Sequence, residues 1–303
     1  WTVSANGKRK QVTLASMEQV LEGAVVVVTG GAAGIGRATA TKMAESGARV
    51  AIGDIHAEKA VETAGEISEM VGREAARTGG KVIGKPLDVT DRDGFELFLD
   101  DVEAEFGPID CLVNNAGVML LGPIDEEERA ATRAMIEVNL VGVINGTQAA
   151  MARMKPRHRG RIVNIASQAG KAGMAGGATY CATKFGVIGF SESVRAELKG
   201  TGVSISWVLP GLVNTELAAG LPDIPLMDLL SPDDIAMAVR AALTDGGSEI
   251  WVPARNQWLD APVRLLPRSL RERVFALTGA DKVLAEADSG RRKEYENRHS
   301  GLS

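Results

Sequence analysis

The sequence predicts an α/β fold in which one parallel β-sheet is covered by helices on both faces. Short β-branched runs alternate with longer amphipathic segments from residue 24 to residue 253, the pattern of parallel strands joined by crossover helices. Because the runs are apolar at successive positions, both faces of the sheet are expected to be buried. A hydrophobic fraction of 45% and 35 glycines among 303 residues suit such a core. Right-handed crossovers would make the sheet doubly wound.

Seven segments have the character of buried strands, and each is separated from the next by enough residues for a helix. The predicted strands are residues 24–30, 48–54, 81–89, 111–117, 160–167, 203–211 and 249–253. Helices are predicted over residues 35–46, from residue 56 towards 77, and from about residue 129. No Pro/Ser-rich linker or internal repeat interrupts residues 17–253, so we expect one domain.

Three regions are predicted along the chain. Residues 1–22 are expected to be a disordered or appended N-terminal arm. The first 16 of them lack the apolar block of a signal peptide, and Met17 is a candidate natural start. Residues 23–253 form the main domain. Residues 254–303 are expected to be a basic helical extension. Residues 255–303 hold ten Lys and Arg against seven Asp and Glu (+3), whereas the rest holds 24 against 32 (-8).

Charge, cysteines and hydropathy argue against several classes of protein. A net charge of -5 and a pI near 5.5 disfavour nucleic-acid binding. Cys111 and Cys181 lie among apolar or small residues, which is typical of a reducing compartment, so we expect a cytoplasmic protein. No apolar run reaches about 18 residues, so no membrane-spanning helix is expected. The histidines, His56, His158 and His299, have no ligand spacing, and no metal site is expected.

The first predicted strand ends in TGGAAGIG, which places Gly30, Gly34 and Gly36 at a turn that opens a helix. Glycines allow a tight turn and let the backbone approach a pyrophosphate, which then lies at the helix N-terminus. The alternative is a chance glycine turn, but the strand–turn–helix setting favours a dinucleotide. GGKVIGKP, at residues 79–86, resembles a second phosphate loop; it has Pro86 in place of Ser or Thr and opens no helix.

The second predicted strand ends at Asp54. A carboxylate there can accept hydrogen bonds from ribose hydroxyls and would repel a 2′-phosphate, which favours NAD over NADP. No Lys or Arg occupies positions 32, 33 or 55, although Arg37 and His56 remain alternatives as partners of a phosphate. The competing interpretation is that Asp54 only caps the following helix.

The segment TYCATKFG contains Tyr180 and, four residues later, Lys184. On a helix, positions i and i+4 share a face, so the ammonium would lie beside the phenol and lower its pKa. That would make the tyrosine a usable acid or base near neutral pH. The alternative is a half-buried tyrosine beside a lysine whose amine reaches solvent.

With NNAG at residues 114–117, VNL around Asn139, Ser167, the YxxxK pair and PG at Pro210 and Gly211, the sequence resembles the short-chain dehydrogenase/reductase family over about residues 23–253. The resemblance implies a single Rossmann-type domain with a seven-stranded parallel sheet and a nicotinamide cofactor across the carboxyl ends of the strands. It also implies a homodimer or homotetramer.

The resemblance assigns roles to individual residues. Asp88 would contact the adenine, Asn114 and Gly117 would shape the cofactor floor, and Thr215 would bind the carboxamide with the backbone near Val213. The residues expected to bind cofactor are Gly30, Gly34, Ile35, Gly36, Asp54, Asp88, Val89, Asn115, Ala116, Gly117, Tyr180, Lys184, Pro210, Gly211, Val213 and Thr215.

Hydride transfer to a ketone builds negative charge on its oxygen, so the site needs a proton donor and a hydrogen-bond partner for that oxygen. Tyr180 is the expected acid, or the base for oxidation, and Ser167 the partner. In the family, Lys184 also holds the nicotinamide ribose, and Asn139 resembles the residue that holds a water between the lysine and solvent. Taken singly, Ser167 could end a strand, Asn139 could be a polar spot in a helix, and Thr215 could cap one.

Other catalytic chemistries are disfavoured. Cys181 has no histidine nearby in sequence and is expected to be a packed thiol, not a nucleophile. No GxSxG motif is present, which argues against an esterase that uses Ser167.

The loops expected to line the substrate site are mainly apolar and include Met119, Gln168, Met174, Leu212 and Leu217. We therefore expect a lipophilic secondary alcohol or ketone. Two alternatives stay open: an NADPH-dependent 3-oxoacyl (carrier-protein) reductase, and a non-catalytic nucleotide-binding scaffold.

The C-terminal extension departs from the family pattern. Apolar residues fall near helical spacing over residues 263–277, and arginines lie between them, so a basic amphipathic helix is predicted. The apolar positions are Val263, Leu266, Leu270, Val274 and Leu277. Three interpretations are open: packing over the substrate mouth of this or a sister subunit, contact with a membrane surface, or a solvated appendage.

Overall fold

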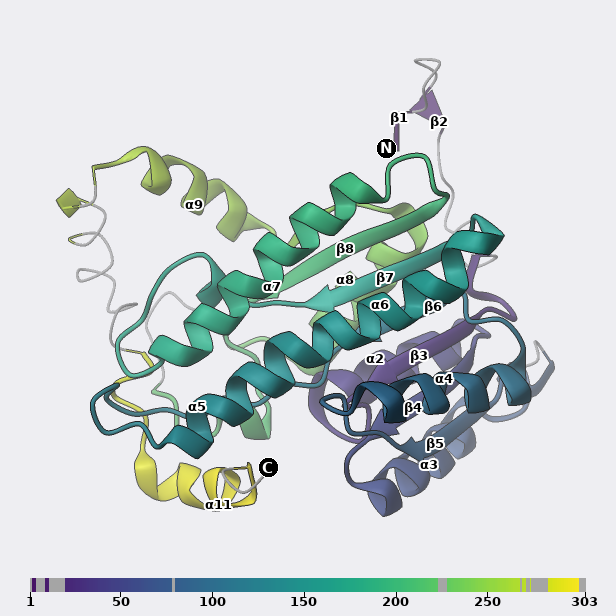
Figure 1. Ribbon diagram of the computed structural model, residues 1–303, viewed down its shortest axis with the longest axis horizontal. Coiled ribbons are helices and arrows are strands. Elements are labelled where there is room, and N and C mark those ends of the chain that lie inside the picture. Colours follow the sequence, from purple (N-terminus) through teal and green to yellow (C-terminus); the bar gives the residue numbers. More distant parts are fainter. Residues whose placement is uncertain are drawn as a thin grey trace.

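A parallel sheet of seven strands runs through the centre of the molecule (Figure 1). The computed structural model describes residues 2–3, 9–10, 20–77, 80–222, 228–267, 269–270, 273 and 283–299. Across the sheet the order is β5 (Val82–Pro86), β4 (Arg49–Asp54), β3 (Val25–Thr29), β6 (Cys111–Asn114), β7 (Gly160–Ile165), β8 (Val203–Pro210) and β9 (Glu249–Val252). This confirms the doubly wound, Rossmann-type prediction with its seven strands. Each strand lies within its predicted range, and most end earlier because the last predicted residues belong to the loops of the site.

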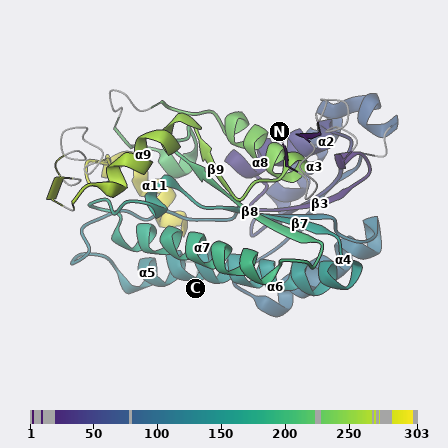
Figure 2. The ribbon, with the colours of Figure 1, turned by 90° about the horizontal axis from the view of Figure 1, so that it is seen from above.

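Helices cover both faces of the sheet, as Figure 2 shows. One layer contains α2 (Gly34–Glu45), α3 (Ala57–Arg77) and α8 (Pro232–Asp245); the other contains α4 (Arg92–Phe106), α5 (Arg129–Ile136), α6 (Gly142–Met154) and α7 (Ala178–Glu197). In β3, Val26 and Val28 pack with Met43 of the first layer, whereas Val25 and Val27 pack into the core of the second. Alternate side chains of one strand therefore enter two cores, which explains the continuous apolar run.

The helix expected from about residue 129 is interrupted. α5 ends at Ile136, a π-helical turn (η1, Glu137–Val141) follows, and α6 begins at Gly142. Asn139 therefore lies in the π turn instead of in a regular helix, which corrects the prediction. The extra residue in the turn rotates the positions after it, and such turns occur often at functional sites.

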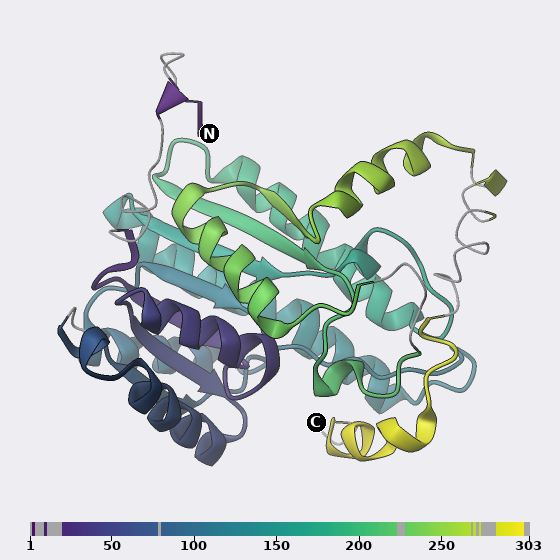
Figure 3. The same cartoon turned by 180° about the vertical axis from the view of Figure 1, so that it is seen from behind.

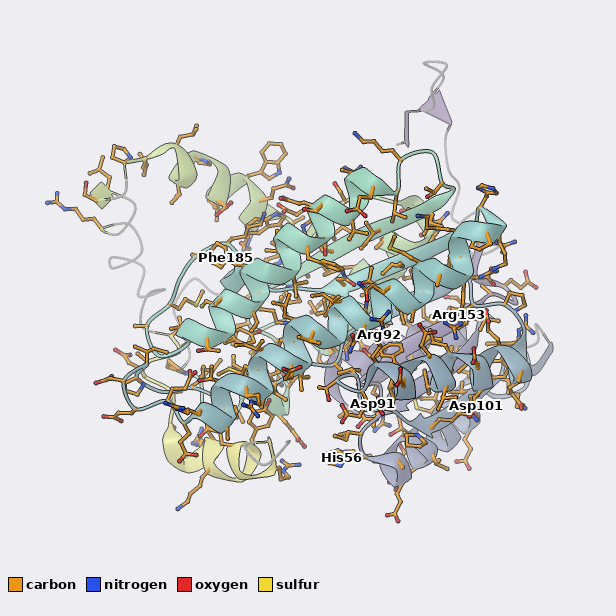
Figure 4. The ribbon with its side chains drawn as sticks, in the orientation of Figure 1. His56, Asp91, Arg92, Asp101, Arg153 and Phe185 are labelled. Carbon is orange, nitrogen blue, oxygen red and sulfur yellow. The ribbon has the colours of Figure 1, made fainter. Side chains whose placement is uncertain are left out.

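Arg153 joins α4 and α6, two of the helices in this layer. Figure 4 shows it on α6 beside α4, where its guanidinium bonds to the carboxylates of Glu96 and Asp100. Its side chain is only 14% exposed. This contact fixes α6, and with it the π turn, against the rest of the domain.

The described residues at the two ends of the chain include short strands and helices. Within the described part of the arm, β1 (Thr2–Val3) pairs antiparallel with β2 (Arg9–Lys10), and Leu21 packs into the core.

At the other end, α9 (Arg255–Leu265) stops before Pro267, which forces Leu266 into an extended conformation. The helix predicted over residues 263–277 is therefore wrong in its start, and Val274 and Leu277 lie outside the described residues. In Figure 3, α11 (Ser289–His299, yellow) lies well away from α9.

Gly36 is where α2 meets the end of β3. A Cβ at this position would lie 2.1 Å from the Gly30 carbonyl oxygen and 2.6 Å from Nδ2 of Asn115. Only glycine lets the helix begin this close to the turn.

We expect Gly36→Ala to lower the free energy of unfolding by roughly 1–3 kcal/mol, because backbone must move to admit the methyl group. Gly65, inside α3, has open space around its Cβ position, so Gly65→Ala should stabilise the protein by about 0.5–1 kcal/mol through helix propensity. Urea unfolding measures both changes, and equal effects of the two substitutions would contradict the close approach at Gly36.

Candidate active site

A cavity of about 370 Å³ lies at the carboxyl ends of the strands. It is bordered by the loops that follow β3, β4, β5, β6, β7 and β8. The strand order reverses between β3 and β6, and in doubly wound sheets ligands bind in the crevice at that reversal. Every residue predicted to bind cofactor lines this cavity except Gly36, which packs beneath it.

The glycine turn leaves backbone donors for an anion. Gly30 and Gly34 have φ of 62° and 52°, values that favour glycine, and a Cβ on Gly30 would lie 2.8 Å from Cα of Ala116. Ala33 provides no side-chain cap for α2, and the first turn of α2 holds no acidic residue. The N-terminus of α2 therefore fits a pyrophosphate, the group that a dinucleotide would place there.

Side chains tie the glycine turn to the NNAG segment. Nδ2 of Asn115 donates to the carbonyls of Thr29 (2.9 Å) and Gly30 (3.0 Å), and Oγ1 of Thr29 accepts from the N–H groups of Asn115 and Ala116. The prediction that Asn114 shapes the cofactor floor is wrong. Its Nδ2 donates to Oδ1 of Asn164 at 2.9 Å, because successive strand residues point to opposite faces and Asn114 points into the core.

The carboxylate of Asp54 lines the cavity and is held by two backbone N–H groups. Oδ2 accepts from the N–H of Ala32 at 3.1 Å, in the glycine turn, and Oδ1 accepts from the N–H of His56 at 3.1 Å, at the start of α3. Arg37 pairs with Glu66 and does not line the cavity. Lys59 does line it, one helical turn after His56, and was missed because no strand or turn signal marks it.

Tyr180 and Ser167 meet at the cavity. Tyr180 is 7% exposed and lines the cavity together with Ser167, whose side chain acts to lower the pKa of the Tyr180 hydroxyl. Oγ of Ser167 also accepts from the N–H of Ala169 at 3.1 Å, which fixes the serine at the turn after β7. The hydroxyl groups of Tyr180, on α7, and of Ser167, in the turn after β7, thus lie at the same cavity.

Lys184 lies behind the tyrosine. It is 5% exposed, its Nζ donates to the carbonyl of Ile165 at 3.0 Å, and that nitrogen is 5.8 Å from the centre of the Tyr180 ring. Burial lowers the pKa of Lys184 to about 8. The expected lowering of the Tyr180 pKa is not found. Burial raises this pKa and outweighs the opposing hydrogen bond from Ser167, since no solvent stabilises a phenolate there.

Asn139 holds the segment between the NNAG motif and the substrate loop. It is fully buried, its Oδ1 accepts from the N–H of Val118 at 2.8 Å, and its Nδ2 donates to the Val118 carbonyl at 2.8 Å. A Cβ on Gly117 would lie 3.2 Å from Oδ1 of Asn139 and 3.7 Å from Nζ of Lys184. The π turn therefore brings the asparagine amide and the ammonium to the same glycine.

The loop after β8 closes the cavity beside the glycine turn. Val213 pairs with Leu230, and Cγ2 of Thr215 lies 3.4 Å from the Cβ position of Gly34. Thr215 makes no side-chain cap for the short helix that follows, so the capping alternative is not observed.

The predicted substrate residues lie at the same cavity: Met119, Gln168, Met174, Leu212 and Leu217. The amide of Gln168 is engaged elsewhere, because Nε2 donates to the Val252 carbonyl and Oε1 accepts from Asn256. Residues of the C-terminal segment also line the cavity, and sequence reasoning missed them: Val283, Leu284, Tyr295 and Arg298. The charged sequence GRRKEYENRH gave no signal of burial.

Residues 24–223 match the family model of the short chain dehydrogenases. The chain belongs to the short-chain dehydrogenase family. It is 36% identical over 234 residues to a cis-4-hydroxycyclohexanecarboxylate dehydrogenase from Sinomonas cyclohexanicum, an alignment that covers 74% of this chain and 90% of that protein. It is 36% identical over 242 residues to a 3-oxoacyl-[acyl-carrier-protein] reductase from Thermotoga maritima, covering 76% and 94%. A D-threitol dehydrogenase from Mycolicibacterium smegmatis is 38% identical over 240 residues, covering 76% and 89%.

This short-chain dehydrogenase is therefore an oxidoreductase that acts on CH–OH groups with an NAD(P) cofactor. Among the helices that the structure describes, none is both long and apolar enough to cross a membrane.

The buried ammonium of Lys184 makes stability depend on pH. Its pKa of about 8 lies below the value of 10.5 for an unperturbed lysine. Below pH 8 the lysine is charged in both states, and the folded state bears the full cost of burial. Between pH 8 and 10.5 the unfolded chain binds more protons, so stability rises with pH.

We expect Lys184→Met to stabilise the cofactor-free protein at pH 7 by about 1–3 kcal/mol, because the methionine buries no charge. The gain should shrink as the pH rises from 8 to 10.5. Urea unfolding at several pH values measures it, with the exposed Lys199→Met as the control. A gain that does not change with pH would show that the ammonium is not the cause.

Proposed function

We propose that this protein interconverts a lipophilic secondary alcohol and the corresponding ketone with NAD, and that Tyr180 transfers the proton. The observation that supports it best is that Tyr180 and Ser167 meet at one apolar cavity, with Lys184 buried behind the tyrosine. A protein that only binds nucleotides has no need for this arrangement.

The proton donor is already in the required form for reduction. Because burial raises its pKa, Tyr180 is protonated at neutral pH and can donate to the substrate oxygen while Ser167 donates a second hydrogen bond. When bound, the nicotinamide cofactor supplies or accepts the hydride. In the oxidative direction Tyr180 must take a proton from the alcohol. The ammonium of Lys184, 5.8 Å from the centre of the Tyr180 ring, would offset part of the cost of forming the phenolate that starts this step.

The remaining residues would bind the cofactor and return a proton to Tyr180 after each reduction. Tyr180 and Lys184 would bind the nicotinamide ribose, and Thr215, with the backbone of Val213, the carboxamide. Asn139 lies next to Lys184 at Gly117, where a water bound to the π turn could pass a proton towards solvent.

Asp54 favours NAD because its carboxylate is fixed at the cavity by two backbone N–H groups. Held there, the carboxylate can accept from ribose hydroxyls but would repel a 2′-phosphate. Asp88 and Val89, which also line the cavity, would contact the adenine.

A second candidate is an NADPH-dependent 3-oxoacyl reductase. One of the relatives is named a 3-oxoacyl-[acyl-carrier-protein] reductase, and Lys59 could partner a 2′-phosphate. The dissociation constants of NAD and NADP separate the two candidates, because only the 3-oxoacyl reductase requires tighter binding of NADP than of NAD.

We also propose a homo-oligomer. Ile136 of α5 and Phe185 of α7 are large apolar residues that are 40% and 46% exposed, and Figure 4 shows Phe185 on the outer side of α7. A second copy of the chain would cover them. Analytical ultracentrifugation tests this assembly.

We expect Tyr180→Phe to lower turnover of a lipophilic secondary alcohol at least about 100-fold, because the proton acceptor is removed. Ser167→Ala should cost roughly 10–100-fold, the loss of one hydrogen bond to the developing charge. An assay of NADH formation over a panel of apolar alcohols measures turnover, and calorimetry checks that NAD still binds. The control is Ser193→Ala, an exposed serine on α7. Undiminished turnover in Tyr180→Phe would refute the assigned proton donor, and NAD binding without turnover of any alcohol would favour the scaffold.

Asp54→Asn should reduce the preference for NAD over NADP by about 10-fold, because it removes the charge that opposes a 2′-phosphate and keeps an oxygen acceptor for Ala32. The ratio of the two dissociation constants is the measurement. Asp93→Asn, on the exposed side of α4, should leave the ratio unchanged. A wild-type preference for NADP would contradict this role of Asp54.

A further inference from the structure

Part of the cavity wall comes from residues 283–299, which lie beyond the family match at residues 24–223. Val283, Leu284 and Tyr295 are 4–6% exposed and belong to one apolar cluster with Met119 and Tyr180. The C-terminal segment of this same chain therefore packs against the candidate proton donor.

Tyr295 is fixed at the loop that follows the NNAG motif. Its hydroxyl oxygen accepts from the N–H of Met119 at 3.1 Å, and the guanidinium of Arg292 lies 5.5 Å from the centre of its ring. Burial raises the pKa of Tyr295 to about 12, so the side chain is neutral and contributes an apolar ring to the cavity.

Arg292 connects α11 to two loops of the cavity, the one after β6 and the one after β8. It is 1% exposed, and its guanidinium donates to the carbonyl of Met119 at 2.6 Å, after β6, and to those of Leu217 (3.0 Å) and Ala219 (2.9 Å), after β8. Glu296 neutralises it at 2.9 Å. A buried arginine with carbonyl partners on two loops holds them at a fixed separation.

Glycines occupy the places where the segment touches other loops. A Cβ on Gly177 would lie 2.4 Å from Cδ1 of Leu284, and one on Gly176 would lie 2.7 Å from Cα of Ala285. A Cβ on Gly220 would lie 2.8 Å from the carbonyl oxygen of Asp288. The segment is thus closely complementary to two loops around the cavity, the one before α7 and the one after β8.

We propose that residues 283–299 form a size-limiting wall of the substrate site, in which Leu284 and Tyr295 contact the substrate and Arg292 is a positioning residue. The inference rests on the proposed function and deepens it. The substrate class is a compact, apolar alcohol or ketone, because the wall joins the loops at residues 117–121, 174–177 and 217–221 around the cavity.

Complexes of the protein with NAD and a ketone test the wall without turnover, because both compounds are in the oxidised form and cannot react. Calorimetry of the NAD-saturated protein with cyclohexanone, cyclooctanone and cyclododecanone gives three dissociation constants. The wild type should bind the largest ring most weakly. Leu284→Ala should improve the affinity for cyclododecanone relative to cyclohexanone by about 10-fold, since three carbons leave the wall. Leu259→Ala, the same change on the exposed face of α9, should leave the ratio unchanged.

Arg292→Gln should shift the ratio in the same direction as Leu284→Ala, because the two loops are no longer fastened. A merely structural arginine would lower the melting temperature and leave the ratio at its wild-type value. An unchanged ratio in folded Leu284→Ala, or no binding of any ketone, would overturn the proposal. A protein that binds the ketones with the predicted ratios but oxidises no alcohol would instead refute the proposed reaction.

Discussion

The burial of Tyr180 and Lys184 on one face of α7 is the constraint on which the site depends. An ammonium with so little contact with water is costly, and the structure offsets part of this cost through the hydrogen bond from Nζ to the Ile165 carbonyl. That carbonyl is at the end of β7, and the π turn places Asn139 against Gly117, the glycine that Lys184 also approaches. The sheet order and the interrupted helix thus serve the same pair of side chains.

Loops around a cavity lack the regular hydrogen bonds of strands and helices, so side chains supply them here. Asn115 and Thr29 join the NNAG segment to the glycine turn, and Asp54 joins that turn to the start of α3. Asn139 hydrogen-bonds to the backbone of Val118. Each of these side chains bonds to backbone of another segment. A change at one of them would therefore move a loop as well as remove a polar group.

The family match and the C-terminal segment contribute different parts of the site. The matched residues carry β3 to β8, the glycine turn, Ser167 and Tyr180. Residues 283–299 add an apolar wall held by Arg292. Reaction class and substrate choice can thus reside in separate stretches of one chain.

By itself, the sequence determined the order of strands and helices, the glycine turn and the candidate pair of Tyr180 and Ser167. These follow from local patterns: apolar periodicity, turn residues and the spacing of motifs. Only the tertiary structure decided that Asn114 points into the core, that burial raises the Tyr180 pKa, and that Arg292 and Tyr295 belong to the cavity. Those outcomes depend on which distant segments meet and which side chains lose contact with water. Local sequence does not determine which distant segments meet or which side chains become buried, because a charged segment can be exposed in one fold and buried in another.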